Sequence, residues 1–163
     1  MNIKKNLFKI YLQKIKRLIL PRDLIRYAVK KHYEKIAVID GERKITYGAL
    51  YKRAKKLANA LLSLEMSKGD KLGVLLYNCQ EYFEIRIASY LTGMVLVPIV
   101  WDMALEDIIF ILNDCKVKTL FYHPQILGKE IEQLKKESNV IYFIKITPMQ
   151  SSFKEVDNEI EYE

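Results

Sequence analysis

The feature that most constrains the fold of this chain is a regular alternation of apolar runs and helical segments after Gly69. Two of the runs, Val74-Leu75-Leu76 and Val95-Leu96-Val97, are apolar at every position and do not alternate with polar residues. Strands that are buried on both faces of a sheet require such a run. Strands that alternate with helices of roughly ten to fifteen residues are typical of right-handed βαβ crossovers and a parallel sheet. The pattern predicts strands at Lys71–Leu76, Met94–Ile99, Thr119–Tyr122 and Val140–Ile146, with helices at 79–91, 105–114 and 124–138 between them.

The segments before Gly69 predict helices and one hairpin. Residues 3–20 place apolar side chains at three- and four-residue spacings between lysines, which indicates an amphipathic helix. Pro21 ends that helix and begins a second, at roughly 22–32. A hairpin follows, with strands at Ile36–Ile39 and Arg43–Thr46 around an Asp40-Gly41 turn. The Thr46 hydroxyl is expected to cap a long helix at 47–65.

These elements predict an α/β protein in three parts. A basic amphipathic helical arm at residues 1–21 precedes an α/β domain at 22–146, which has a parallel sheet with flanking helices. After Pro148 the apolar periodicity is lost and acidic residues accumulate. Residues 147–163 are therefore expected to form a flexible tail.

The net charge of +7 is concentrated in the arm. Residues 1–31 contain ten Lys or Arg and one acid, Asp23, so they carry +9 and the rest of the chain carries −2. No apolar run approaches the ~20 residues that cross a bilayer, and no secretory signal is visible. We expect a cytoplasmic location, with weak binding to a membrane surface through residues 3–20 as an alternative to packing of that helix on the protein.

The cysteines and histidines give weak chemical signals. Cys79 and Cys115 lie far apart without the CxxC spacing of a metal site, and the chain has only two histidines, His32 and His123. The pattern therefore does not predict a zinc site. The cysteines are interpreted as reduced packing residues. Neither histidine has a nucleophile partner, and each is interpreted as a surface or capping residue.

Three other features of the sequence are candidate sites. Asp107 and Asp114 lie seven residues apart and share one face of a predicted helix. Carboxylates at the start and end of a helix are ordinary, so the pair is not interpreted as a site. Trp101 follows a predicted strand, where open α/β sheets bind ligands, but packing is favoured over a substrate cleft. Gly128-Lys129 lacks a glycine-rich lead and a following Ser or Thr, so it is interpreted as helix surface rather than as a phosphate loop.

Four stretches, in order and well separated, resemble the opening of one enzyme family. They are Ala37–Gly41, then Ile45-Thr46-Tyr47, then Gly69-Asp70 before a strand, and a long stretch that holds Leu76-Tyr77-Asn78-Cys79-Gln80-Glu81, Gly93, Val97-Pro98 and Ile111-Leu112-Asn113-Asp114. Over roughly residues 22–146 they resemble adenylate-forming acyl-CoA synthetases, luciferases and peptide-synthetase adenylation domains. The resemblance implies the N-terminal subdomain of an ATP-dependent acid–CoA ligase with an acyl-adenylate intermediate.

The motif residues have structural explanations. Asn78 and Glu81 fit a capping box, and Gly93 fits a left-handed position past a helix end. The family binds its substrates with a glycine-rich phosphate loop ending in Pro-Lys-Gly, an acid for the ribose, a Glu for magnesium and a C-terminal lysine. No residue here matches them, so the resemblance assigns this chain no catalytic, cofactor-binding or metal residue. ATP, magnesium and CoA are expected for the full-length family.

The sequence leaves three functions open, and with them whether the chain is an enzyme. The first is a ligase fragment that is inactive alone. Either the remainder of the ligase, on another chain, completes it, or the fragment associates with itself through an uncovered strand edge at Val140–Ile146. The second is a non-catalytic peripheral membrane or partner-binding module that uses the basic N-terminal helix. Nucleic-acid binding by the arm is disfavoured, because aromatic interleaving and a recognised fold motif are missing.

Overall fold

A computed structural model describes residues 20–147, 154–156 and 159–162 of this chain. The chain divides into two compact units, residues 1–53 and 54–163. The amphipathic helix predicted at 3–20 lies outside the described residues except for its last position. The predicted domain boundaries after residues 21 and 146 stay predictions.

The first unit contains α2 (Pro21–His32), the strands β1 (Ile36–Asp40) and β2 (Arg43–Thr46), and the start of α3 (Tyr47–Ser63). Pro21 occupies the first turn of α2, where its missing N–H has no intrahelical partner to lose. The β1–β2 hairpin is antiparallel, and its last pair is Asp40 with Arg43.

Two local predictions for this unit have different outcomes. The hairpin turn is formed by Gly41 and Glu42, one residue later than the predicted Asp40-Gly41, because Gly41 takes the positive φ of 59° while Asp40 stays in the strand. The predicted cap is confirmed, since the Ala49 N–H donates to Thr46 Oγ1 at 3.2 Å.

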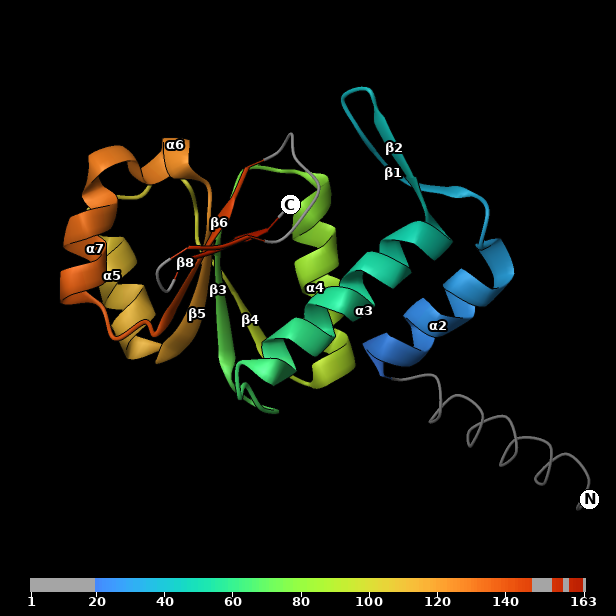
Figure 1. Cartoon of the computed structure of the whole chain (residues 1–163), viewed down its shortest axis with the longest axis horizontal. Coiled ribbons are helices and arrows are strands. Elements are labelled where there is room, and N and C mark those ends of the chain that lie inside the picture. The colour runs from blue at the N-terminus through green and yellow to red at the C-terminus, as the bar shows by residue number, and fades with distance from the viewer. Residues whose placement is uncertain (1–19, 148–153, 157–158, 163) are drawn as a thin grey trace, which may run out of the picture. The chain divides into compact units, whose positions relative to one another are not determined.

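The second unit is built on one sheet (Figure 1). Its strand order is β4-β3-β5-β6-β8-β7, and β4, β3, β5 and β6 are mutually parallel, as predicted. The sheet therefore confirms the α/β class. The bounds are β3 Lys71–Leu75, β4 Val95–Pro98, β5 Val117–Tyr122, β6 Tyr142–Ile146, β7 Lys154–Val156 and β8 Glu159–Tyr162.

Helices connect the parallel strands. They are α4 (Gln80–Thr92), α5 (Leu105–Asp114), α6 (Pro124–Leu127), the 3-10 turn η1 (Gly128–Glu130) and α7 (Ile131–Glu137). The single helix predicted at 124–138 is wrong, because Gly128 takes a φ of 50° and ends α6 after one turn.

The C-terminal segment adds two strands that the sequence analysis did not anticipate. β8 pairs in parallel with β6, and β7 pairs antiparallel with β8. The expectation of an uncovered edge at Val140–Ile146 is wrong, because β6 lies between β5 and β8. Flexibility of residues 147–163 stays a prediction.

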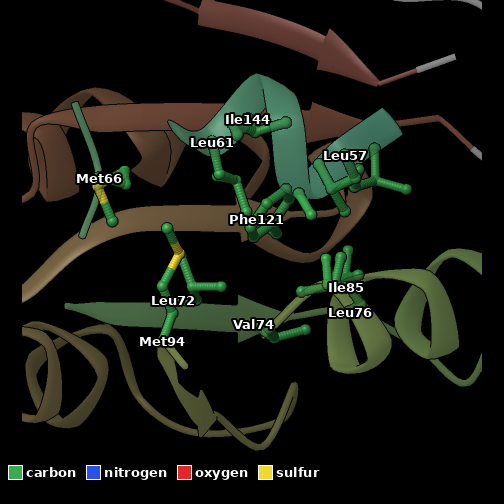
Figure 2. Packing of buried hydrophobic residues seen from close by; sticks show 13 residues of the cluster. Leu57, Leu61, Met66, Leu72, Val74, Leu76, Ile85, Met94, Phe121 and Ile144 are labelled. Carbon is green, nitrogen blue, oxygen red and sulfur yellow. The ribbon is translucent and has the colours of Figure 1, made fainter. Parts of the chain in front are cut away.

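Two apolar clusters cover the two faces of the sheet. Residues 57–61 of α3 and the inner face of α4 pack on one face, where Leu61, Leu72 and Phe121 are fully buried (Figure 2). Helices α5 and α7 cover the other face with Leu112 and Leu134. A strand that is buried on both faces needs apolar side chains in both directions, which explains the runs without alternation.

Helix α4 shows one correct and one wrong capping prediction. Gly93 follows it with a φ of 77°, and its N–H donates to the Ser89 carbonyl, as predicted for a left-handed cap. The capping box is wrong, because Cys79 is the N-cap residue and makes no side-chain cap hydrogen bond. Asn78 thus precedes the cap, one position too early to accept a bond from the first turn.

Candidate functional site

Three aromatic side chains meet where the parallel strands β3, β4 and β5 end. Tyr77 lies two residues past β3, Trp101 three past β4, and His123 directly past β5. The ring centroids of Tyr77 and Trp101 are 5.4 Å apart, and those of Tyr77 and His123 are 5.2 Å apart in an edge-to-face arrangement. We call these three residues the carboxyl-edge cluster.

The position of this cluster follows from the order of the strands. After β3 the chain crosses to β4 on one side, then returns past β3 to place β5 on the other side. This reversal is a topological switch point, and open α/β sheets bind ligands at the carboxyl ends of strands beside such a point. Trp101 therefore lies at the sheet edge to which the sequence pattern assigned it.

The cluster combines a buried imidazole with two accessible rings. His123 is 7% exposed, whereas Tyr77 is 39% and Trp101 is 52% exposed. The backbone N–H of His123 donates to the Leu75 carbonyl at 3.0 Å and fixes the end of β5 against β3. The exposed half of the Trp101 side chain rules out burial in the core, whereas packing at an interface and a role in a substrate cleft both stay predictions.

The His123 imidazole is buried, and one of its two nitrogens accepts a hydrogen bond. Burial lowers the pKa of His123, since desolvation disfavours its charged form. Nδ1 accepts a hydrogen bond from the Gln125 N–H at 3.2 Å, so the proton of the neutral ring is on Nε2. The predicted capping role is confirmed, and the surface alternative is wrong because the side chain is buried.

This arrangement is suited to contact rather than to proton transfer. Nδ1 is occupied by a backbone donor, so the ring has no free basic nitrogen, and the neighbouring rings offer faces and edges for stacking. Nucleophilic catalysis needs a nucleophile within hydrogen-bond reach of its base, and the contacts of His123 in the described residues do not supply one.

The other candidate residues lie apart from the cluster. Asp107 is in the first turn of α5 and Asp114 is its last residue, as the ordinary interpretation of these carboxylates expected. Cys79 and Cys115 are both half-buried, and they do not form a disulfide. Within residues 20–147 no group of three His, Cys, Asp or Glu side chains has the geometry of a metal site. His32 packs its ring at 6.0 Å from that of Tyr47 in the first unit.

The glycines do not fit a triphosphate cradle. Such a cradle needs clustered backbone N–H groups that point at the ligand. The Gly128 N–H instead donates to the Pro124 carbonyl, that of Gly69 to Gly93, and that of Gly48 to Tyr33. Lys129 stands in a three-residue 3-10 turn on the surface, which agrees with its interpretation as helix surface.

A buried polar group at the start of α4 was missed by sequence reasoning. Gln80 Nε2 donates to Glu84 Oε1 at 2.9 Å, and Glu84 is fully buried. Glu81 is also buried, and none of the three side chains is without a partner. The i, i+4 spacing of Gln80 and Glu84 was visible in the sequence, but burial of that helix face was not.

Comparison with known proteins gives a consistent family match. The sequence model of a family described as AMP-binding enzyme matches residues 25–161. A peroxisomal benzoate–CoA ligase of Arabidopsis thaliana is 30% identical over an aligned length of 148 residues, and the match covers 85% of this chain and 26% of that protein. The fatty acid–[acyl-carrier-protein] ligase ScoC of Streptomyces coeruleorubidus is 29% identical over 98 residues, 60% of this chain and 19% of that protein.

Solved structures match at the level of the fold. A mutant form of coronafacic acid ligase from Pectobacterium brasiliense has a TM-score of 0.75 at 16% identity, covering 86% of this chain and 27% of its own. A benzoate CoA ligase from Burkholderia xenovorans has a TM-score of 0.72 at 17% identity, covering 78% of this chain and 26% of its own. The chain thus spans about a quarter of the length of these relatives.

Proposed function

Because this chain belongs to the AMP-binding enzyme family, we propose that it forms the N-terminal part of an ATP-dependent carboxylic acid–CoA ligase. The observation that carries the proposal is the family match over residues 25–161, which includes the parallel strands β3, β4, β5 and β6. The named relatives act as ligases on acids as different as benzoate and fatty acids. The class of acid is therefore left open.

We propose that these residues supply structure rather than chemistry to the ligase. The described glycines do not cradle a triphosphate, and the His123 imidazole has its basic nitrogen occupied. On the family resemblance, ATP, magnesium and CoA are bound by residues with no counterpart in this chain. The part of the chain described here would build the sheet on which those residues are placed.

The carboxyl-edge cluster would then be a contact surface within the complete ligase. Its two accessible rings lie at the switch point of the sheet, where a ligand or a further protein segment is received. We propose that its partner is the remainder of the ligase, provided by other residues of the same protein or by another chain. Self-association of the isolated residues is the alternative, and a cytoplasmic location stays part of this proposal.

Acid-dependent exchange of pyrophosphate into ATP tests the division between structure and chemistry. We expect the 163 residues alone to give no exchange above background with fatty, aromatic or short-chain acids. The intact Arabidopsis benzoate–CoA ligase is the positive control, and its own matched N-terminal quarter is the matched negative control. Acid-dependent exchange by the purified chain would show that it carries catalytic groups and would refute the proposal.

A further inference from the structure

Helix α2 carries an apolar stripe on its outer face. Leu24 and Tyr27 are 52% and 56% exposed, and their spacing of three residues places them on one side of the helix. Leu20, the residue directly before the helix, is 47% exposed. The opposite side holds Val29, which is buried. The helix therefore has two apolar faces, and only one of them is used by the fold described here.

Basic side chains lie beside this stripe and elsewhere on the helix. Lys31 lies one turn beyond Tyr27, with Nζ 5.8 Å from the centre of the tyrosine ring. The twelve residues of α2 carry a net charge of +3, because they contain four basic residues and one acid. The basic residues are Arg22, Arg26, Lys30 and Lys31, and the acid is Asp23. Arg22 and Arg26 have side chains that are 48% and 59% exposed, and both lie near Asp23.

The sequence places more positive charge directly before this helix. Residues 1–19 contain six Lys or Arg and no Asp or Glu, whereas the chain beyond residue 31 sums to −2. Positive charge and exposed apolar side chains therefore occur together in one part of the protein. A nucleic acid would require the charge but not the apolar stripe, and a second copy would bring like charges together.

We propose that the outer face of α2, formed by Leu24 and Tyr27 with the preceding Leu20 and with Arg26, Lys30 and Lys31, binds the surface of an anionic lipid bilayer. The leucines enter the boundary between headgroups and acyl chains, and the tyrosine ring lies at headgroup depth. The basic side chains face the anionic headgroups, to which each contributes electrostatic attraction. This inference concerns the location of the protein and does not depend on the proposed ligase function.

Co-sedimentation of the full chain with vesicles tests the inference. We compare vesicles of phosphatidylcholine alone with vesicles that also contain phosphatidylserine, at low and at high salt. We expect binding that requires phosphatidylserine and is weakened by salt. Binding to neither vesicle, or equal binding to both, overturns the proposal.

Paired variants locate the contact. Leu24→Glu combined with Tyr27→Glu places two anions in the stripe and should weaken binding by about tenfold or more. Phe110→Glu is the matched control, because Phe110 is 68% exposed on α5, and it should bind like the parent chain. All these side chains are exposed, and unchanged far-UV circular dichroism checks that the variants fold. Equal binding by the double variant and the parent overturns the proposal.

A spectroscopic readout reports insertion directly. Trp101 is the one tryptophan of the chain, so Tyr27→Trp in a Trp101→Phe background places a single reporter on α2. We expect its emission to shift to the blue with anionic vesicles and to stay unchanged with a single-stranded RNA. A shift with the RNA but not with vesicles would assign this face to nucleic acid and refute the lipid assignment.

Discussion

Replacement of Gly73 by alanine tests the packing of the central strand. Gly73 lies in β3, and a Cβ at this position would be 3.0 Å from Leu120 Cδ1, 3.0 Å from Val117 Cγ1 and 3.2 Å from Leu112 Cδ2. All three neighbours are at most 1% exposed, so they have no solvent space into which to move. The absence of a side chain at Gly73 allows α5 and β5 to approach β3 closely.

The expected magnitude follows from two opposing terms. Overpacking a dense core by one methyl group costs about 1–3 kcal/mol of unfolding free energy. Loss of glycine's freedom in the unfolded chain returns about 0.4–1 kcal/mol. The net destabilisation of Gly73→Ala is therefore about 0.5–2 kcal/mol, which is a decrease in Tm of about 2–6 °C for a chain of this size.

Urea unfolding followed by Trp101 fluorescence measures this change, because Trp101 lies in the same compact unit as Gly73. Val117→Ala removes one of the two nearest methyl groups and serves as the partner in a double-mutant cycle. We expect Gly73→Ala to cost about 1 kcal/mol less in that background. A Gly73→Ala variant that is as stable as the parent, or costs that add fully, would refute the packing argument.

Three further outcomes are expected. Asp70→Asn should lower the free energy of unfolding by up to about 1 kcal/mol at neutral pH, since Asp70 pairs with Lys118 at 2.8 Å. The pairing lowers the pKa of Asp70, so its stabilisation is present above the unfolded pKa of 3.8 and is lost as pH falls through the folded value. A difference in urea midpoints between the variant and the parent that does not change with pH would contradict this. Gly48→Ala should destabilise the protein although alanine favours helices, since the added Cβ would lie 2.5 Å from the Tyr33 ring. In a Tyr33→Ala background the same change should stabilise the protein by about 1 kcal/mol, and thermal melts in which the effect of Gly48→Ala on stability has the same sign in both backgrounds would refute the clash. Trp101→Ser should reduce any concentration-dependent light scattering of the isolated chain, since Trp101 is half exposed, and unchanged scattering would remove it from the contact.

The parallel sheet could be predicted from the sequence because its strands are buried on both faces. Burial of this kind leaves an unbroken apolar run, and Leu72 to Leu76 show it directly. β8 was missed, although Glu159-Ile160-Glu161-Tyr162 alternates with a period of two. The acidic composition of the tail outweighed that weaker signal, and no local pattern in the sequence indicates that β8 pairs with β6.

The candidate site could be predicted only in part. Trp101 could be placed at the carboxyl edge of the sheet from its position after a strand. Its contact with Tyr77, and that of Tyr77 with His123, depends on β3 lying between β4 and β5, and strand order is set by tertiary packing rather than by local pattern. Burial of the His123 ring depends on the same neighbours, so the sequence predicted its cap but not the lowering of its pKa by burial.

In the function proposed above, this chain supplies the sheet, and not the chemistry, of an acid–CoA ligase. Its most direct test is a chimera in which the chain replaces the matched N-terminal quarter of the Arabidopsis benzoate–CoA ligase. Benzoate-dependent pyrophosphate exchange is measured against the same enzyme without that quarter. We expect exchange by the chimera and none by the truncated enzyme. A chimera that folds with a cooperative thermal transition, yet gives no more exchange than the truncated enzyme, would contradict it.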